Sequence, residues 1–190
     1  MVLRLEVSSL SGKFLVAMPG LQDPTFEESV IYITAHDHSG ASGFIVNLPT
    51  AEGHFSDLCS KLQIPYSSRR TIPMMYGGPV DRKKGTVVHS SDYKSDAGTL
   101  DIGENICATT TVDIIEELAA GRGPHRAVLF MGSCSWGPGQ LEQEIMDNSW
   151  LIAERQDSLI YSDNADITWQ LAMESMGVSA LKLSPIYGHA

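Results

Sequence analysis

Residues 126–145 read RAVLFMGSCSWGPGQLEQEI, and the rest of the chain can be interpreted around this stretch. The apolar run 126–132 is typical of a buried strand. Residues 133–139 contain two glycines and a proline, which predict a loop. Residues 140–145 then resemble the first turns of a helix. Strand, tight loop and helix in this order are where α/β proteins often place a functional loop.

Length, composition and net charge predict one acidic domain. A length of 190 residues with 43% apolar content predicts a single domain over residues 1–190 with one sizeable core. The net charge of −10 disfavours a broad phosphate-binding face, because nucleic-acid binding needs clustered Lys and Arg. The densest basic group is Arg82-Lys83-Lys84.

Cysteine usage and hydropathy favour the cytoplasm. Cys59, Cys107 and Cys134 are odd in number and widely spaced, which argues against a disulfide framework and against a CxxC zinc site. The first twenty residues make a poor signal peptide, and no apolar run approaches the length of a membrane span. We therefore expect a cytoplasmic protein without a membrane segment.

Periodicity elsewhere predicts interspersed strands and helices, the pattern of an α+β (mixed α/β) fold. The predicted strands are 13–18, 29–35, 43–48, 86–89, 104–109, 150–153 and 159–161. The predicted helices beyond the central stretch are 55–62, 112–120 and 165–176, the last one capped by Ser162 or Asp163. Strands 29–35 and 43–48 should form a hairpin across the loop 36–40.

Four ordered blocks resemble the AlgH/YqgE family. They are the opening 18–43 (MPGLQDPTF, SVIYI, His36 and GASG), then 77–80 (GGPV), 132–145, and the ending 188–190 (GHA). The similarity runs from about residue 13 to the end. It implies a single bacterial α/β domain with a bent mixed sheet folded towards a pseudo-barrel and flanking helices. Family members are labelled uncharacterised or transcriptional regulators, and no established catalytic residue carries over.

The chain departs from the family pattern at three positions. Ala35 stands where an acidic residue is usual, and Ser42 where methionine is common. Ser135 replaces a glycine before the tryptophan. This last change matters if the position needs a positive φ, which serine tolerates poorly.

Cys134 is the candidate nucleophile of the predicted loop. A helix start could lower its pKa, and a loop position predicts that it reacts before Cys59 and Cys107. The nucleophile elbow needs glycine two residues after the nucleophile, and here that residue is Trp136. The alternative is a small side chain that fills the core. Trp136 itself has two interpretations, a core-packing indole or an anchor for a partner.

Phosphate and metal sites find little support. The loop lacks the Lys-Ser/Thr of a P-loop, and Glu142 and Glu144 at the helix start make that end less attractive to an anion. His36-Asp37-His38 supplies ligand-type side chains without a third or fourth partner nearby, so we interpret it as a solvated hairpin loop. We predict no catalytic residue, metal or cofactor.

A candidate functional surface combines two of the family blocks: Cys134, Trp136, Gly139, Gln140, Glu142, Gly77, Gly78 and Pro79. The first hypothesis is a non-enzymatic, regulatory protein acting through a protein partner or a small ligand. The second is a transcriptional regulator contacting DNA, which the charge and the acidic helix 112–120 make doubtful. The third is an enzyme using the loop 132–144. The partner and the oligomeric state stay open.

Overall fold

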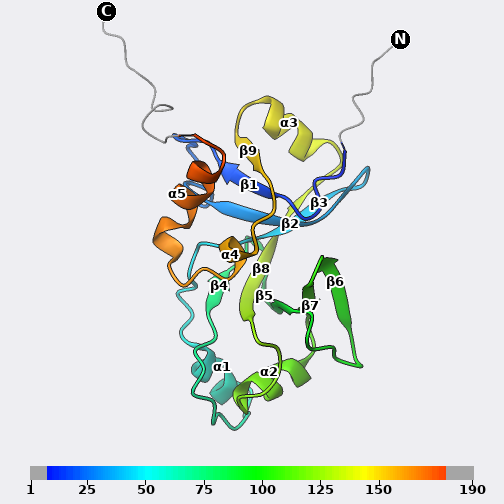
Figure 1. Cartoon of the computed structure of the whole chain (residues 1–190), viewed down its shortest axis with the longest axis vertical. Coiled ribbons are helices and arrows are strands. Elements are labelled where there is room, and N and C mark those ends of the chain that lie inside the picture. The colour runs from blue at the N-terminus through cyan, green and yellow to red at the C-terminus, as the bar shows by residue number, and fades with distance from the viewer. Residues whose placement is uncertain (1–7, 179–190) are drawn as a thin grey trace, which may run out of the picture.

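Strand β8, Ala127–Trp136, runs through the middle of the molecule and pairs with three other strands (Figure 1). β3 and β5 flank it antiparallel, and β4 pairs with it in parallel. The computed structural model describes residues 8–178. Within that range the sheet has nine strands in the order β6-β7-β5-β8-β3-β2-β1-β9, with β4 beside β8. β8 therefore joins the two halves of the sheet.

The other strands are mostly short. Their bounds are β1 Phe14–Ala17, β2 Val30–Asp37, β3 Gly40–Ile45, β4 Met74–Tyr76, β5 Val80–Ser90, β6 Thr99–Gly103, β7 Ile106–Thr109 and β9 Trp150–Ala153. The helices are α1 Phe55–Lys61, α2 Val112–Ala119, α3 Gln140–Met146, α4 Asp157–Ile160 and α5 Ala165–Ser175.

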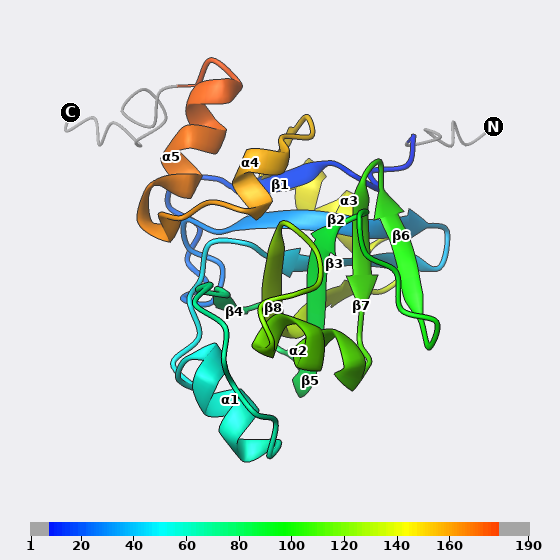
Figure 2. The same cartoon turned by 60° about the horizontal axis from the view of Figure 1, so that its bottom comes forward.

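The sheet curls into a half-barrel (Figure 2). Its edge strand β6 approaches β2 across the opening, where the Tyr32 hydroxyl donates a hydrogen bond of 2.9 Å to the carbonyl of Ile102. The fold is a single-domain, mixed α/β half-barrel with flanking helices, as the resemblance implied.

Side chains of β8 reach three core clusters, because they alternate along the strand and the alternation is interrupted at Gly132, whose φ is 75°. Val128 and Phe130 face the concave interior, where α4 and α5 add further apolar side chains. Leu129 and Met131 face outwards and pack with α1 and α2. Further along, Cys134 and Trp136 pack beneath α3. One strand thus ties every helical layer to the sheet.

The loop predicted over 133–139 is wrong in its first half. Trp136, Ser135 and Cys134 pair with Ala41, Ser42 and Gly43 of β3, so β8 continues through Trp136. The ladder supplies backbone partners that a local pattern cannot reveal. Ser135 lies in extended backbone, so its position needs no positive φ. Only residues 137–139 turn the chain into α3.

Other sequence predictions need correction as well. The predicted strand 159–161 falls in the helix α4, whose consecutive Leu159 and Ile160 are both buried against the interior core. Strand β6 was not predicted, although Thr99-Leu100-Asp101-Ile102 alternates polar and apolar residues over a short stretch; it forms through pairing with β7. Asn164 caps α5 through its side chain, in place of Ser162 or Asp163. The motif 188–190 lies outside the described residues.

The hairpin of β2 and β3 is tighter than predicted. Asp37 pairs with Gly40, so only His38 and Ser39 form the turn. His36 belongs to β2 and is 8% exposed, which corrects its assignment to a solvated loop.

Candidate functional site

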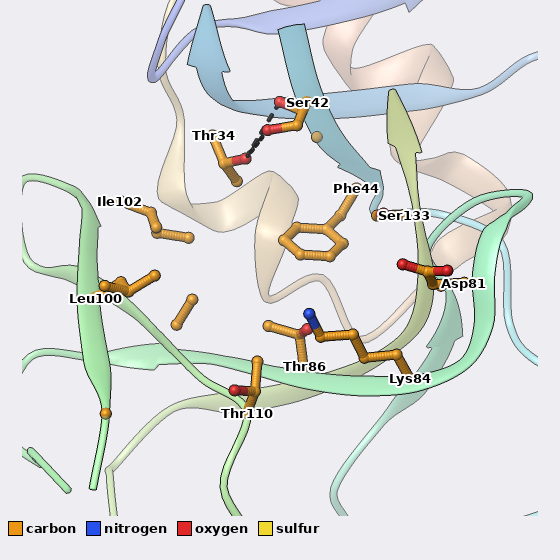
Figure 3. A pocket seen from close by; sticks show the side chains of 14 residues that line it. Thr34, Ser42, Phe44, Asp81, Lys84, Thr86, Leu100, Ile102, Thr110 and Ser133 are labelled. Carbon is orange, nitrogen blue, oxygen red and sulfur yellow. Dashed lines mark hydrogen bonds between the residues drawn. The ribbon is translucent and has the colours of Figure 1, made fainter. Parts of the chain in front are cut away.

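A cavity of about 300 Å³ opens on the concave face of the half-barrel (Figure 3). Six strands and the segments beside them contribute to its wall. The lining residues are Thr34, Ser42, Gly43, Phe44, Asp81, Lys84, Thr86, Gly98, Leu100, Ile102, Ala108, Thr110, Gly132 and Ser133. Tyr32 of β2 pairs with Phe14 of β1 and with Phe44 of β3, and Thr34 follows Tyr32 by two residues. The cavity therefore continues the interior core outwards.

The cavity combines apolar surface with hydroxyl groups. Phe44 stacks on Phe130 with ring centroids 5.0 Å apart, which fixes the apolar floor. Leu100 and Ile102 of β6 lie opposite. The hydroxyls come from Thr34, Ser42, Thr86, Thr110 and Ser133. Sites for small molecules have this mixture of apolar surface and a few polar groups, in volumes of about 300–1,000 Å³.

Charged side chains stand at one side of the cavity. β5 leaves its ladder with β8 here: Val80 pairs with Ser133 and Gly85 with Met131, so residues 81–84 bulge out opposite Gly132. Asp81 at the start of the bulge has a φ of 50°. Such irregularities often occur next to functional sites, where they redirect side chains. Asp81 and Lys84 both line the cavity.

This cavity was not predicted from the sequence. Hydroxyl residues replace apolar ones at alternate positions in strands that are otherwise apolar, as with Thr34 after Tyr32 and Ser42 before Phe44. That pattern and the basic group 82–84 were the available signals. The half-barrel curl that brings them together depends on long-range strand pairing.

The predicted surface is divided by the fold. Gly77 and Gly78 are buried where the turn after β4 crosses β8, and a Cβ on Gly78 would lie 2.3 Å from the backbone of Ser133. Cys134 is 2% exposed, with its Sγ 3.5 Å from the carbonyl oxygen of Gly77. Burial raises the pKa of the Cys134 thiol to about 12. Pro79 beside them is exposed.

A second group gathers around α3. The carboxylate of Glu144 accepts hydrogen bonds from the indole nitrogens of Trp136 (2.9 Å) and Trp150 (2.8 Å), and from the side-chain amide of Gln140 (3.0 Å). Trp136 is 6% exposed. Glu144, absent from the predicted surface, thus links α3 to β8 and β9.

Glu142 and Gly139 complete that second group. The side chain of Glu142 turns back to the sheet and contacts His36. Its own backbone amide and the His36 ring hold the pKa of Glu142 below its ordinary value. Gly139 is exposed and begins the helix with a φ of 74°.

Metal-binding clusters and membrane-spanning helices are both absent from residues 8–178. No group of three His, Cys, Asp or Glu side chains gathers closely enough there to hold a metal ion. None of the helices in that range combines the length and apolarity that crossing a bilayer requires.

The fold and the order of its motifs place the chain among mixed α/β half-barrel proteins. Comparison with known proteins then identifies its family. Residues 14–181 match the model of the AlgH-like family, so the chain belongs to this family, as the four blocks indicated. It is 44% identical over 183 residues to a UPF0301 protein of Ruegeria pomeroyi, covering 95% of this chain and 99% of that one. A UPF0301 protein of Paracoccus denitrificans is 43% identical over 188 residues, with 97% and 99% covered.

Two solved structures share the fold. The solution structure of the AlgH protein from Pseudomonas aeruginosa superimposes with a TM-score of 0.76 at 30% identity, covering 97% of each chain. A crystal structure of a Corynebacterium diphtheriae protein gives a TM-score of 0.70 at 20% identity, covering 92% of this chain and 91% of that one. The latter supports the fold alone.

Proposed function

We propose that this protein is a non-enzymatic, cytoplasmic binding protein that acts in regulation by taking a small ligand into the concave cavity. The observation that carries the proposal is the cavity itself, which is lined mostly by strand residues and placed on a packed core. Strands hold their side chains more rigidly than loops do, so such a site is formed before the ligand arrives.

The chemistry of the lining favours binding over catalysis. It offers hydroxyls, one ammonium and one carboxylate, and neither His nor Cys occurs in it. Hydroxyls next to apolar surface orient a ligand through hydrogen bonds while the apolar part supplies affinity. A small ligand is therefore the preferred form of the first hypothesis, ahead of a protein partner.

The two other hypotheses gain less support. Direct DNA contact would need a basic face, whereas α2 carries Asp113, Glu116 and Glu117 in a chain of net charge −10. Catalysis at residues 132–144 would need a reactive group, and the raised pKa of Cys134 keeps that thiol protonated at neutral pH.

A ligand screen by nuclear magnetic resonance tests the proposal. We expect a library of small metabolites to contain compounds that shift the amide signals of cavity residues such as Thr34, Phe44 and Ala108. Ala108→Leu fills part of the cavity and should weaken these shifts, whereas Ala35→Leu, an exposed position on β2, should leave them unchanged. A library without any compound that perturbs the cavity would refute the proposal.

A further inference from the structure

The geometry points to a ligand class, and this inference rests on the proposed function: we propose that the cavity binds a small organic anion, an aryl or short acyl carboxylate, whose charged end is held by Lys84. The apolar body of the ligand would lie between Phe44 and the β6 residues Leu100 and Ile102. The hydroxyls of Thr86 and Thr110 stand on the same side as Lys84 and can donate to the carboxylate.

The bulge 81–84 carries a local excess of positive charge beside the cavity, and its Asp81 and Lys84 line the wall. It contains one carboxylate and three cations, all exposed, in a chain whose net charge is −10. Among residues 8–178, none of the four takes part in an ion pair within 4.0 Å. A local excess of cations that form no ion pair within the described part of the chain attracts an anion that the rest of the surface repels.

The members of the bulge point in different directions. The guanidinium of Arg82 lies over the ring of Tyr76, 5.6 Å from its centroid, and Lys83 is absent from the cavity wall. The Lys84 side chain runs inwards, with its ammonium group near Phe44 in Figure 3, while Asp81 lies towards Ser133. Lys84 is therefore the cation placed to meet a ligand inside.

The apolar wall opposite Lys84 also has surface that no other side chain of residues 8–178 covers. Leu100 is 69% exposed although it lines the cavity, so its side chain still faces water. Covering such a side chain is favourable, and a ligand that covers it must carry an apolar body. A bare inorganic anion would satisfy Lys84 alone. The combination selects a molecule with one charged end and one apolar end.

Three probes with the same phenylpropyl body separate charge from shape: hydrocinnamate, its primary amide and phenylpropylamine. Isothermal titration should give the anion an affinity at least about tenfold above the amide, because charge-assisted hydrogen bonds are the stronger kind. Lys84→Met should abolish this preference and keep amide binding. Lys83→Met, its matched control in the same bulge, should keep the preference.

Any other titration result contradicts the proposed ligand class, and the ligand library screened by nuclear magnetic resonance shows whether the proposed function is refuted too. Equal affinities for anion and amide, or tighter binding of the amine through Asp81, would refute the preference for an anion. The cavity would still be a binding site. Failure of all three probes while the library yields cavity ligands would overturn the ligand class alone. Failure of probes and library together would overturn the proposed function as well.

Discussion

The imidazole Nε2 of His36 lies 2.9 Å from Oε1 of Glu142, and this contact joins β2 to the first turn of α3. On the other side of the ring, Nδ1 accepts a hydrogen bond of 3.0 Å from the backbone amide of Leu10. Nδ1 must therefore carry no proton, which leaves Nε2–H to donate to Glu142. The hydrogen bond from Leu10 thus sets the tautomer of His36, and the contact with Glu142 holds α3 against β2.

Glu142→Gln should destabilise the protein more at neutral pH than in acid. The pKa of Glu142 is lowered in the folded state, so its carboxylate stabilises the fold above the ordinary value of about 4.3. That stabilisation disappears as the pH falls through the lowered pKa. Urea unfolding at pH 6 and pH 3 measures the difference. The exposed Glu116→Gln on α2 is the control, and an equal loss at both pH values would contradict the linkage.

Trp136→Ala should cost about 3–5 kcal/mol of unfolding free energy, the range for deleting a large buried aromatic. Its indole is 6% exposed and shares the Glu144 carboxylate with Trp150. Trp136→Phe keeps most of the packing and loses the hydrogen bond, so it should cost less. Denaturant unfolding compares both variants. A loss below about 1 kcal/mol for the alanine variant would instead favour Trp136 as an anchor for a partner.

Local patterns predicted those elements whose side chains alternate or repeat around one buried face. The strand 29–35, the hairpin and the helix 165–176 are examples, and the structure confirms their places. A glycine loop predicted over 133–139 failed because Ser133 and Ser135 look like loop residues. In fact Ser135 is exposed between the buried Cys134 and Trp136, which is the alternation of a strand.

The contacts around the candidate sites depend on distant residues and could not be predicted. His36 meets Glu142 across 106 positions, and the Tyr32 hydroxyl reaches Ile102 across 70. The second contact holds β6 near β2 and so encloses the cavity. No local pattern encodes such pairs, because they arise from the order of strands in the curled sheet.

The three thiols should be protected in the folded protein. Cys134, Cys107 and Cys59 are all buried, and burial raises the pKa of each, to about 12 for Cys134 and about 11 for Cys107. The thiolate is the nucleophile. A thiol with a pKa of about 12 is ionised in only about one molecule in ten thousand at pH 8. The expectation that Cys134 reacts first assumed a loop position, whereas Cys134 lies in β8.

Timed alkylation read by mass spectrometry checks this protection. The folded chain at pH 8 should stay unmodified while the urea-unfolded chain reacts at all three positions. Rapid labelling of Cys134 alone in the folded chain would mean that the end of β8 opens from β3 in solution.

Two glycines with the same backbone conformation separate strain from close packing. Gly132 has a φ of +75° and Gly139 a φ of +74°, so alanine pays a similar conformational cost of about 1–2 kcal/mol at either position. A Cβ on Gly132 would also lie 2.4 Å from the carbonyl oxygen of Gly78, whereas one on Gly139 meets nothing within 4 Å. Gly132→Ala should therefore destabilise the protein clearly more than Gly139→Ala in urea unfolding. Equal losses would show that the backbones around Gly132 separate easily, and that its conformation alone requires glycine.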